Sequence, residues 1–571
     1  MDQLRRVLKG EPVSAGIAVA KAYTYEPLEL NTCKITFAKG MEREYVKQFQ
    51  NTLAKAKEEL CNIYTMVAQD NEKNAQIFLA HQMILEDEEL QKDILKAIER
   101  DRMYPDTAVE VVFGMYAKKF ATLPDDMFVK RLKDIQDVEK RLIRIWQGKK
   151  EHSLSKIEED VIVVAHDLLP SDIASMNYEH VLGIITEIGG ETSHCAILAK
   201  YYQIPAVLGV RDAMKRIADG MEIGLDALHG EVILDLTGED CLRLEKSRLH
   251  LLEKFEDEKQ YLNQPAETKD GERIQIGLNL ATENYEAEDL CYDYIGLLRT
   301  EFLYMERMAL PTEEEQFEAY KKIVDSAKGK PVTLRTLDIG GDKTLPYMDL
   351  PKEDNPFLGK RALRLCLDRQ DIFLVQIRAV LRASAFGKLR ILFPMVENME
   401  DIYRAKALVK KAMEELEEQE IPYDKEISIG VMIEVPSLGM IADMVADEVD
   451  FASIGTNDLV QYSCAADRSN RAVADYYQSY APAMIRFMGN ILDAFHKKGK
   501  DIGVCGEMVG NPKGASLCVG LGARWLSMDV SNIASVKAAL SGVTLQELKK
   551  SADICKNLRT QQEVMAFLGM L

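Results

Sequence analysis

The chain has 571 residues, 47% of them hydrophobic and 29% charged, which is ordinary for a soluble globular protein of about three or four domains. Its formal net charge of −21 argues against nucleic acid as the main partner. Any anionic substrate must therefore be held by a local group of arginines. No apolar run is long enough to span a bilayer, and no signal-peptide core follows the first residues, so we expect no membrane insertion. The ten cysteines form no Cys-x-x-Cys pair and predict reduced thiols in a cytoplasmic protein.

The N-terminal part of the chain begins with strands and returns to strands after a long interval. Residues Pro12 to Tyr23 are typical of short strands, with a turn at Ser14-Ala15-Gly16. Further apolar runs predict strands at Val161 to Ala165, Val181 to Thr186, Ala206 to Val210 and Glu231 to Leu236. The simplest interpretation is one α/β domain that is interrupted by an insertion.

The interval between these strands has a helical pattern. Apolar residues recur at helical spacing from about Phe37 to Trp146, and Pro105 and Pro124 break the region into several helices. A charged segment with leucines at helical spacing, Glu239 to Leu262, predicts a linking helix. We predict these domains: an α/β domain over 1–35 and 148–238, a helical domain over 36–147, a linker helix over 239–265, and a final domain over 266–571.

The C-terminal half alternates strand-like and helix-like segments. Eight such repeats over roughly 300 residues predict a (β/α)8 barrel. The expected strands are Ile274 to Leu280, Tyr294 to Arg299, Val332 to Leu337, Leu389 to Pro394, Ile427 to Glu434, Phe451 to Ile454, Ile502 to Cys505 and Trp525 to Met528. The predicted fold class is thus a multidomain α/β protein, with a helical insertion in its first domain and a barrel at its C-terminal end.

One histidine follows a turn that suits phosphate chemistry. The apolar run from Val181 leads into Gly189-Gly190, and Thr192, Ser193 and His194 precede a short helical pattern. A glycine turn that feeds a helix start exposes backbone N–H groups, which favour a phosphate. We therefore predict that His194 carries a phosphoryl group. The alternative is that His194 only caps or packs the helix start.

Polar residues fall at or just after the carboxyl ends of several predicted barrel strands, where the active site of this fold lies. They are Arg299, Arg335, Glu434, Asn457, Asp458 and Cys505. Glu434 and Asp458 supply hard oxygen ligands, which suit magnesium rather than zinc. The alternative is that one carboxylate only neutralises a nearby arginine.

Arginines and one cysteine complete this predicted site. Arg299, Arg335 and Arg468 can hold phosphate and carboxylate groups in forked geometry, and Arg361 is a further candidate. Cys505 is a weak acid that can protonate a carbanion, unless it is only a packing residue. Together these residues require a small, doubly anionic, magnesium-bound substrate whose reaction ends in a protonated carbon. Phosphoenolpyruvate (PEP) fits, with a histidine on another domain as the phosphoryl acceptor.

Six stretches of the barrel half resemble a known family. They are IGLLRTEFLYMERMALPTEEEQF from Ile295, LRTLDIGGDKTLPYMDLPKEDNPFLGKRALR from Leu334, LRASAFGKLRILFPMVE from Leu381, IGVMIEVPS from Ile429, IGTNDLVQYSCAADR from Ile454 and VCGEMVG from Val504. The chain is similar, over essentially its full length, to Enzyme I of the PEP-dependent sugar phosphotransferase system. The helical insertion, and the lack of room for an ATP-binding domain, distinguish it from pyruvate phosphate dikinase and PEP synthase.

The resemblance implies a phosphotransferase that moves the phosphoryl group of PEP through a phosphohistidine to the carrier protein HPr. It implies a swivelling histidine domain, a carrier-docking site in the helical domain near His81, and a homodimer through the barrel. It implies these roles: phosphohistidine, His194; proton donor, Cys505; PEP ligands, Arg299, Arg335, Asn457, Asp458 and Arg468; Mg²⁺ ligands, Glu434 and Asp458.

Three positions near the histidine depart from the family pattern. Glu191 replaces the usual arginine, Lys200 replaces another arginine, and Ile173 replaces a hydroxyl residue. We expect Glu191 to pair with Lys200, or else to slow phosphorylation. Three alternatives stay open: a divergent paralogue with another carrier, a PEP synthase-like enzyme with a separate nucleotide-binding chain, and a non-catalytic protein that binds PEP as a signal.

Overall fold

The structure is a computed structural model that describes residues 6–25, 32, 35–70, 72–121, 126–149, 154, 157–168, 172–173, 176–190, 194–282, 290–305, 307, 309–341, 345, 347–348, 353–468 and 470–570. The chain divides into two compact units, Met1–Glu253 and Lys254–Leu571. The division falls inside helix α10 (Gly238–Lys259), where the sequence predicts a linking helix. The finer domain boundaries stay predictions.

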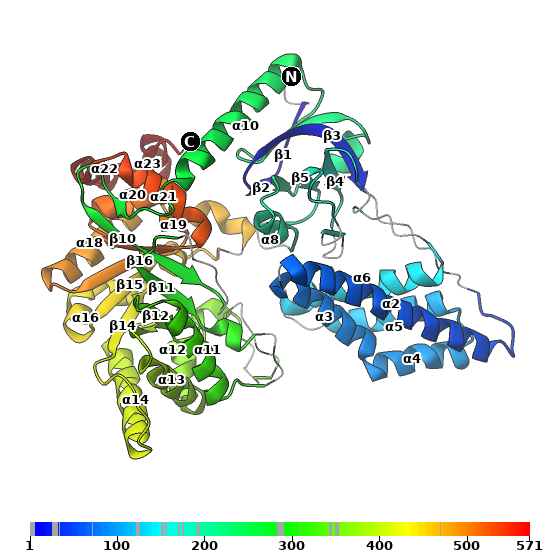
Figure 1. Cartoon of the computed structure of the whole chain (residues 1–571), viewed down its shortest axis with the longest axis horizontal. Helices are drawn as coiled ribbons and strands as arrows, with labels where there is room; N and C mark the ends of the chain where they lie inside the picture. Colours follow the sequence, from blue (N-terminus) through cyan, green and yellow to red (C-terminus); the bar gives the residue numbers. More distant parts are fainter. Residues whose placement is uncertain are drawn as a thin grey trace. The chain divides into compact units, whose positions relative to one another are not determined.

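The first unit contains a mixed sheet (Figure 1). Its strands, in spatial order, are β1 (Val7–Lys9), β8 (Glu231–Ile233), β7 (Glu222–Asp226), β3 (Ile17–Tyr25), β4 (Val161–Ala165), β5 (Val181–Thr186), β6 (Ala206–Leu208) and β2 (Glu11–Ser14). Strands β3 to β6 run parallel at the centre, and the other pairings are antiparallel. Every residue of β4 is buried, because apolar clusters cover both faces of the sheet. Among the described residues of this unit, the short helices α8 (His194–Tyr201) and α9 (Ala213–Arg216) accompany the sheet.

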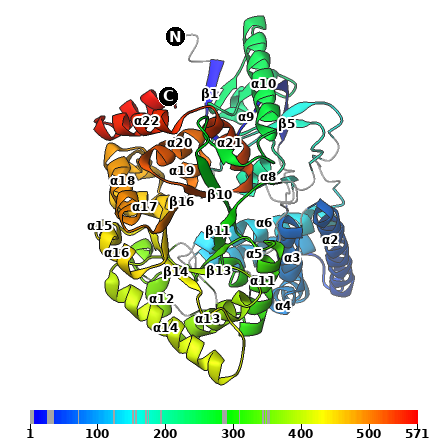
Figure 2. The ribbon, with the colours of Figure 1, turned by 60° about the vertical axis from the view of Figure 1, so that its left-hand side comes forward.

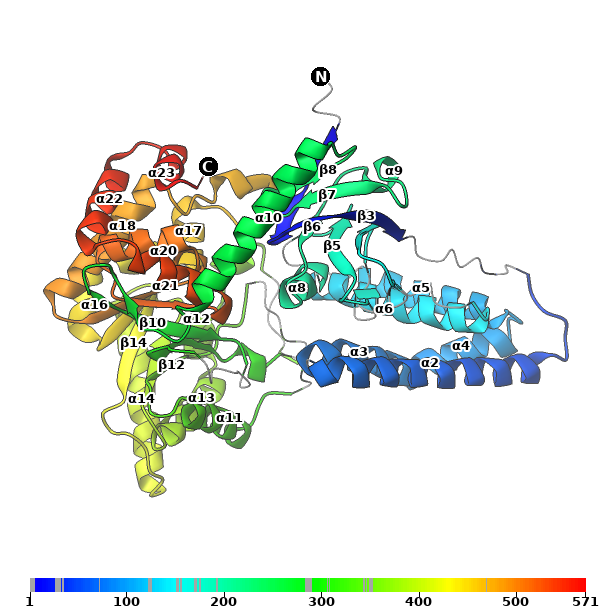
Figure 3. The same ribbon diagram turned by 45° about the horizontal axis from the view of Figure 1, so that its top comes forward.

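The predicted helical insertion is helical and has its own apolar core. Its helices are α2 (Glu42–Asp70), α3 (Glu72–Glu86), α4 (Glu88–Glu99), α5 (Pro105–Ala121) and α6 (Asp126–Trp146). Helices α2, α3, α5 and α6 lie side by side (Figure 3) and bury Phe49, Phe78 and Phe113. Helix α5 begins at Pro105, where the missing N–H has no intrahelical partner to lose. Pro124 lies outside the described residues.

The second unit is a closed barrel of parallel strands, as the sequence predicts (Figure 2). The strands are β10 (Arg273–Leu280), β11 (Tyr294–Arg299), β12 (Val332–Arg335), β13 (Leu389–Phe393), β14 (Ser428–Ile433), β15 (Phe451–Gly455), β16 (Asp501–Cys505) and β17 (Trp525–Met528). Closure comes from β10, which pairs in parallel with both β11 and β17. A short strand, β9 (Ala266–Glu267), pairs antiparallel with β10.

Helices surround the barrel strands (Figure 2). They are α11 (Glu313–Ser326), α12 (Leu363–Asp368), α13 (Gln370–Ser384), α14 (Met399–Glu418), α15 (Pro436–Met440), α16 (Ala442–Glu448), α17 (Thr456–Cys464), α18 (Pro482–Lys497), α19 (Glu507–Gly510), α20 (Pro512–Leu521), α21 (Ile533–Ser541), α22 (Leu545–Asn557) and α23 (Gln561–Leu568). One-turn 3₁₀ helices include η2 (Glu301–Leu303), directly after β11. Within the described residues, no helix has the length and apolarity needed to cross a bilayer.

The barrel interior is filled by large side chains that glycines accommodate. The first residues of β11 and β15 are Tyr294 and Phe451. A Cβ on Gly277 would stand 2.6 Å from the Tyr294 ring, and one on Gly430 would stand 2.6 Å from the Phe451 ring. Arg390 of β13 lies against the Phe451 ring, 4.6 Å from its centroid. This packing fills the amino-terminal end of the barrel, so the opposite, carboxyl end is left for the site.

Candidate functional site

The sequence-predicted barrel residues lie at the carboxyl ends of the strands. Arg299, Arg335 and Cys505 are the last residues of β11, β12 and β16, and Glu434 directly follows β14. Asn457 and Asp458 occupy the first turn of α17, directly after β15, and Arg468 follows that helix. Parallel strands of a closed barrel point the same way, so these residues share one end of the fold.

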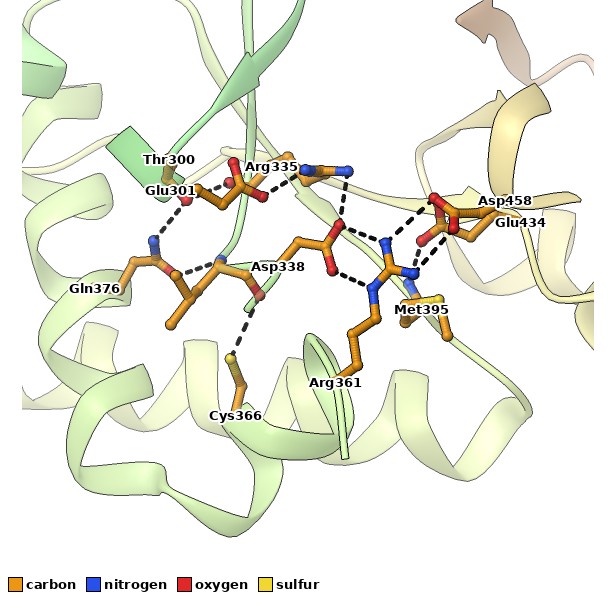
Figure 4. A network of polar contacts seen from close by, with 11 residues as sticks. Thr300, Glu301, Arg335, Asp338, Arg361, Cys366, Gln376, Met395, Glu434 and Asp458 are labelled. Carbon is orange, nitrogen blue, oxygen red and sulfur yellow. Dashed lines mark hydrogen bonds and ion pairs between the residues drawn. The ribbon is translucent and has the colours of Figure 1, made fainter. Parts of the chain in front are cut away.

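A buried ionic network links two of the arginines through carboxylates. Arg335 contacts Glu301 at 2.5 Å and Asp338 at 3.0 Å. Asp338 also accepts hydrogen bonds from Arg361 Nε and Nη2, at 2.8 and 3.0 Å. Arg361 in turn binds both carboxylate oxygens of Asp458, at 2.9 and 3.2 Å. Figure 4 shows the contacts that run from Glu301 to Asp458.

The network keeps both guanidinium groups charged and fixed. Arg361 and Asp338 have side chains only 2% and 1% exposed. Burial alone would lower the pKa of Arg335 and of Arg361, but the neighbouring carboxylates outweigh it and raise both values. Forked contacts of this kind set the orientation of a guanidinium as well as its charge. The two arginines are therefore held as rigid cations before any ligand arrives.

Glu434 lies beside Asp458 and forms a pair of carboxylates that favours a cation (Figure 4). Its side chain is buried, and its Oε1 accepts a hydrogen bond from the Met395 N–H at 2.6 Å. Burial raises the pKa of Glu434, and the carboxylates of Asp458 and Asp338 raise it further. A hard divalent cation would relieve this repulsion. The described residues contain no cluster of three or more potential metal-ligating side chains, so water or substrate oxygens would complete the coordination.

Donors for an anion remain on this face. Arg335 Nε is buried, and none of the described residues provides it with an acceptor. The side chains of Arg299 and Arg468 are exposed, and neither forms an ion pair with a described carboxylate. The Arg468 main-chain N–H donates to Gln461 Oε1 at 3.0 Å, which anchors the segment after α17. The site can therefore attract an anion with exposed cations and hold it against a buried one.

Cys505 is a buried thiol that stays protonated near neutral pH. Its Sγ lies 3.4 Å from Ser453 Oγ and 3.5 Å from the Ile454 carbonyl oxygen. Burial raises the pKa of this thiol, while the Ser453 hydroxyl acts in the opposite direction. An acid that keeps its proton until a stronger base appears suits the protonation of a carbanion.

The structure describes the main chain of His194 at the first residue of α8, but not its side chain. Gly189, in the turn after β5, has φ +119°, a conformation that favours glycine. Ile173 is fully buried in the apolar cluster that also contains Cys195 and Ala196. Glu191, Thr192 and Ser193 lie outside the described residues, so the pairing of Glu191 with Lys200 stays a prediction.

Two carboxylates of the network were not predicted from the sequence. Glu301 follows Arg299 by two positions, and Asp338 follows Arg335 by three. Both lie within the motifs that carry the family resemblance. A carboxylate close in sequence to a strand-end arginine, within an otherwise apolar segment, was the signal available for finding them.

The sequence matches known families over most of its length. The PEP-binding domain of PEP-utilising enzymes matches residues 255–545, their mobile domain matches 157–230, and their N-terminal domain matches 9–131. Together with the barrel and its strand-end site, these matches define the class, a multidomain PEP-utilising enzyme.

Similar proteins of known name identify the family within this class. The chain is 41% identical to the phosphoenolpyruvate-protein phosphotransferase of Bacillus subtilis, covering 98% of this chain and 99% of that protein. It is 38% identical to the phosphoenolpyruvate-protein phosphotransferase of Staphylococcus epidermidis, covering 100% of both. The chain therefore belongs to the phosphoenolpyruvate-protein phosphotransferase family. Among solved structures, an Enzyme I protein determined by NMR is 32% identical and covers 43% of this chain and 99% of its own, with a TM-score of 0.39.

Proposed function

We propose that this protein transfers the phosphoryl group of PEP to His194 and then to an HPr-like phosphocarrier protein. The family membership over the whole chain supports this reaction. The observation that carries it is a single barrel end that holds fixed arginines, a carboxylate pair and a protonated thiol. That combination suits an anionic substrate whose product carbon must be protonated.

The arginines and Asn457 bind and orient PEP in this proposal. Exposed Arg299 and Arg468 receive the anion, and the buried Nε of Arg335 supplies a further donor. Because Glu301 and Asp338 already fix Arg335, little reorganisation accompanies binding. Glu434 and Asp458 would hold Mg²⁺, which when bound neutralises charge on the substrate oxygens.

The chemical step breaks one bond to phosphorus and forms another. The P–O bond of PEP breaks, a ring nitrogen of His194 forms the new P–N bond, and the electron pair stays on the enolate of pyruvate. Cys505 then gives its proton to the methylene carbon of the enolate, which yields pyruvate. In-line transfer needs reacting atoms within about 3–3.5 Å, so the α/β part that carries His194 must approach the barrel.

The domain boundaries, the docking site of the carrier and the dimer are assigned from the family resemblance. We propose the domains 1–35 with 148–238, 36–147, 239–265 and 266–571, with the carrier docking on the helical domain over 36–147 and with dimerisation through the barrel. A sedimentation measurement that finds only monomers at micromolar concentration would remove the dimer from this proposal.

Pyruvate release tests the function. Without a carrier, rapid mixing with PEP and Mg²⁺ should release a burst of about one pyruvate per chain, because His194 can be phosphorylated only once. Adding an HPr-type carrier should convert the burst into continuous turnover. Turnover that requires ATP and an added chain would instead favour a PEP synthase-like enzyme, and PEP binding without any burst would favour a non-catalytic sensor.

A further inference from the structure

The segments that directly follow β15 and β16 are joined by hydrogen bonds. Thr456 Oγ1 donates to the main-chain carbonyl of Cys505 at 3.0 Å. The main-chain N–H of Glu507 donates to Asn457 Oδ1 at 3.0 Å, and Asn457 Nδ2 donates to Glu507 Oε1 at 3.0 Å. Residues 505–507 thus pair with residues 456–457 through three hydrogen bonds, two of which belong to Glu507.

The contacts with Glu507 determine which way the Asn457 carboxamide points. A main-chain N–H can only donate, so the Asn457 atom that faces it must be the oxygen. The Glu507 carboxylate can only accept when ionised, so it must face the Asn457 nitrogen. One hydrogen of Nδ2 is used in this way, and the second hydrogen remains available for an anion. Tyr477 fixes the main chain, since its hydroxyl donates to the Asn457 carbonyl at 3.1 Å.

Gly506 allows this close approach. Its φ is +114°, and a Cβ here would lie 2.2 Å from Thr456 Oγ1 and 2.8 Å from Asn457 Oδ1. A glycine is therefore required between Cys505 and Glu507. Gly506 thus lets the end of β16, which carries the thiol, contact the start of α17, which carries Asn457, and Glu507 links the two by hydrogen bonds.

We propose that Glu507 is a positioning residue for phosphoryl transfer. Its side chain orients the carboxamide of Asn457 toward an anion and holds the end of β16, which carries Cys505, against the start of α17. This inference rests on the proposed function, in which Asn457 binds PEP and Cys505 donates the proton. Glu507 is exposed and acidic, so its charge also opposes an anionic substrate. The hydrogen bond and the charge therefore act in opposite directions, and substitutions can separate them.

Two substitutions and a matched control test the proposal. Glu507→Gln keeps an acceptor for Asn457 Nδ2 and removes the charge, whereas Glu507→Ala removes both. Glu400→Ala removes an exposed carboxylate from the first turn of α14, a residue with no role in the site. For each full-length protein, the KM for PEP and the kcat of pyruvate formation are measured with saturating Mg²⁺ and carrier. The midpoint of thermal unfolding is measured separately.

We expect Glu507→Ala to raise the KM for PEP by about tenfold, the size of one hydrogen bond to an anion, with a several-fold loss of kcat. Glu507→Gln should keep the KM within about twofold of wild type or lower it. All three variants should melt near the wild-type midpoint. In addition, iodoacetamide should alkylate Cys505 faster in Glu507→Ala than in Glu507→Gln, because only the alanine variant loses the side-chain hydrogen bond between Asn457 and residue 507.

Contrary results have distinct meanings. If the alanine variant keeps wild-type kinetics while the wild type turns over PEP, the proposed function stands and the positioning role is wrong. If the glutamine variant is as impaired as the alanine variant, the charge matters rather than the orientation, and the proposal is again wrong. If the wild type forms no pyruvate and binds no PEP, the proposed function itself fails, and this inference fails with it.

Discussion

At the scale of single residues, the site depends on buried charges that neutralise one another. Asp338 is 1% exposed and lies between Arg335 and Arg361, so each guanidinium depends on the same carboxylate. Removing one partner of such a pair leaves a buried cation unpaired. The resulting loss of stability is larger than the stability that the intact pair adds. Arg335 was predictable from its place at a strand end and Arg361 was a further candidate, but the partner of Arg361 was not predicted. Asp458 is 97 residues away, and only folding brings it within 2.9 Å.

Substituting the shared carboxylate should destabilise the barrel. Asp338→Asn keeps the size of the side chain but removes its charge, so we expect the free energy of unfolding to fall by about 3 kcal/mol. Asp443→Asn, at an exposed position in α16, should change it by less than about 0.5 kcal/mol. Urea denaturation compares the three proteins. Equal midpoints and slopes for Asp338→Asn and wild type would contradict the role assigned to Asp338.

The pH dependence of alkylation tests the state of Cys505. Because burial raises its pKa, the thiol is protonated at neutral pH, and the reactive thiolate appears only as the pH rises through that elevated value. The rate of iodoacetamide modification should therefore rise about tenfold per pH unit from pH 7 and continue to rise beyond pH 8.5, the ordinary cysteine range. Peptide mapping against Cys505→Ala isolates this residue. A plateau below pH 8 would mean that the pKa is lowered instead.

At the scale of elements, the barrel strands were the most predictable part. The barrel strands are short runs that contain several apolar residues, and the ends of runs such as Val332–Arg335 and Trp525–Met528 were predicted within two residues. Strands β1, β7 and β9 were not predicted. They are two to five residues long, and their partners are β8, β3 and β10, so distant pairing rather than local pattern defines them.

The glycines inside the barrel should be sensitive to a single added methyl group. In Gly430→Ala the new Cβ would lie 2.6 Å from the Phe451 ring, so the ring must move within a filled interior. We expect a loss of about 1–3 kcal/mol of stability. Gly542→Ala is the matched control, because its nearest neighbours are 3.8 Å away and its φ is −81°. Thermal unfolding that ranks the control below Gly430→Ala would contradict the packing described for the interior.

At the scale of the whole molecule, the division into Met1–Glu253 and Lys254–Leu571 separates the histidine from the barrel site. The second unit has its own extended apolar core and all of the predicted PEP ligands. A fragment from Lys254 to Leu571 should therefore fold and bind PEP in the presence of Mg²⁺, yet form no phosphoprotein. Calorimetry with this fragment provides the test. A folded fragment that binds no PEP would show that the first unit contributes to the substrate site.

Locating the phosphate on the protein tests directly whether PEP phosphorylates His194. The full-length protein is incubated with PEP labelled in its phosphoryl group and with Mg²⁺, and the peptide that carries acid-labile label is identified beside a His194→Ala variant. We expect label on His194 in the wild type, and none in the variant, with PEP binding nearly unchanged because the proposed PEP site lies in the barrel. Undiminished acid-labile label in the variant, or label confined to any residue other than His194, would contradict phosphoryl transfer to His194.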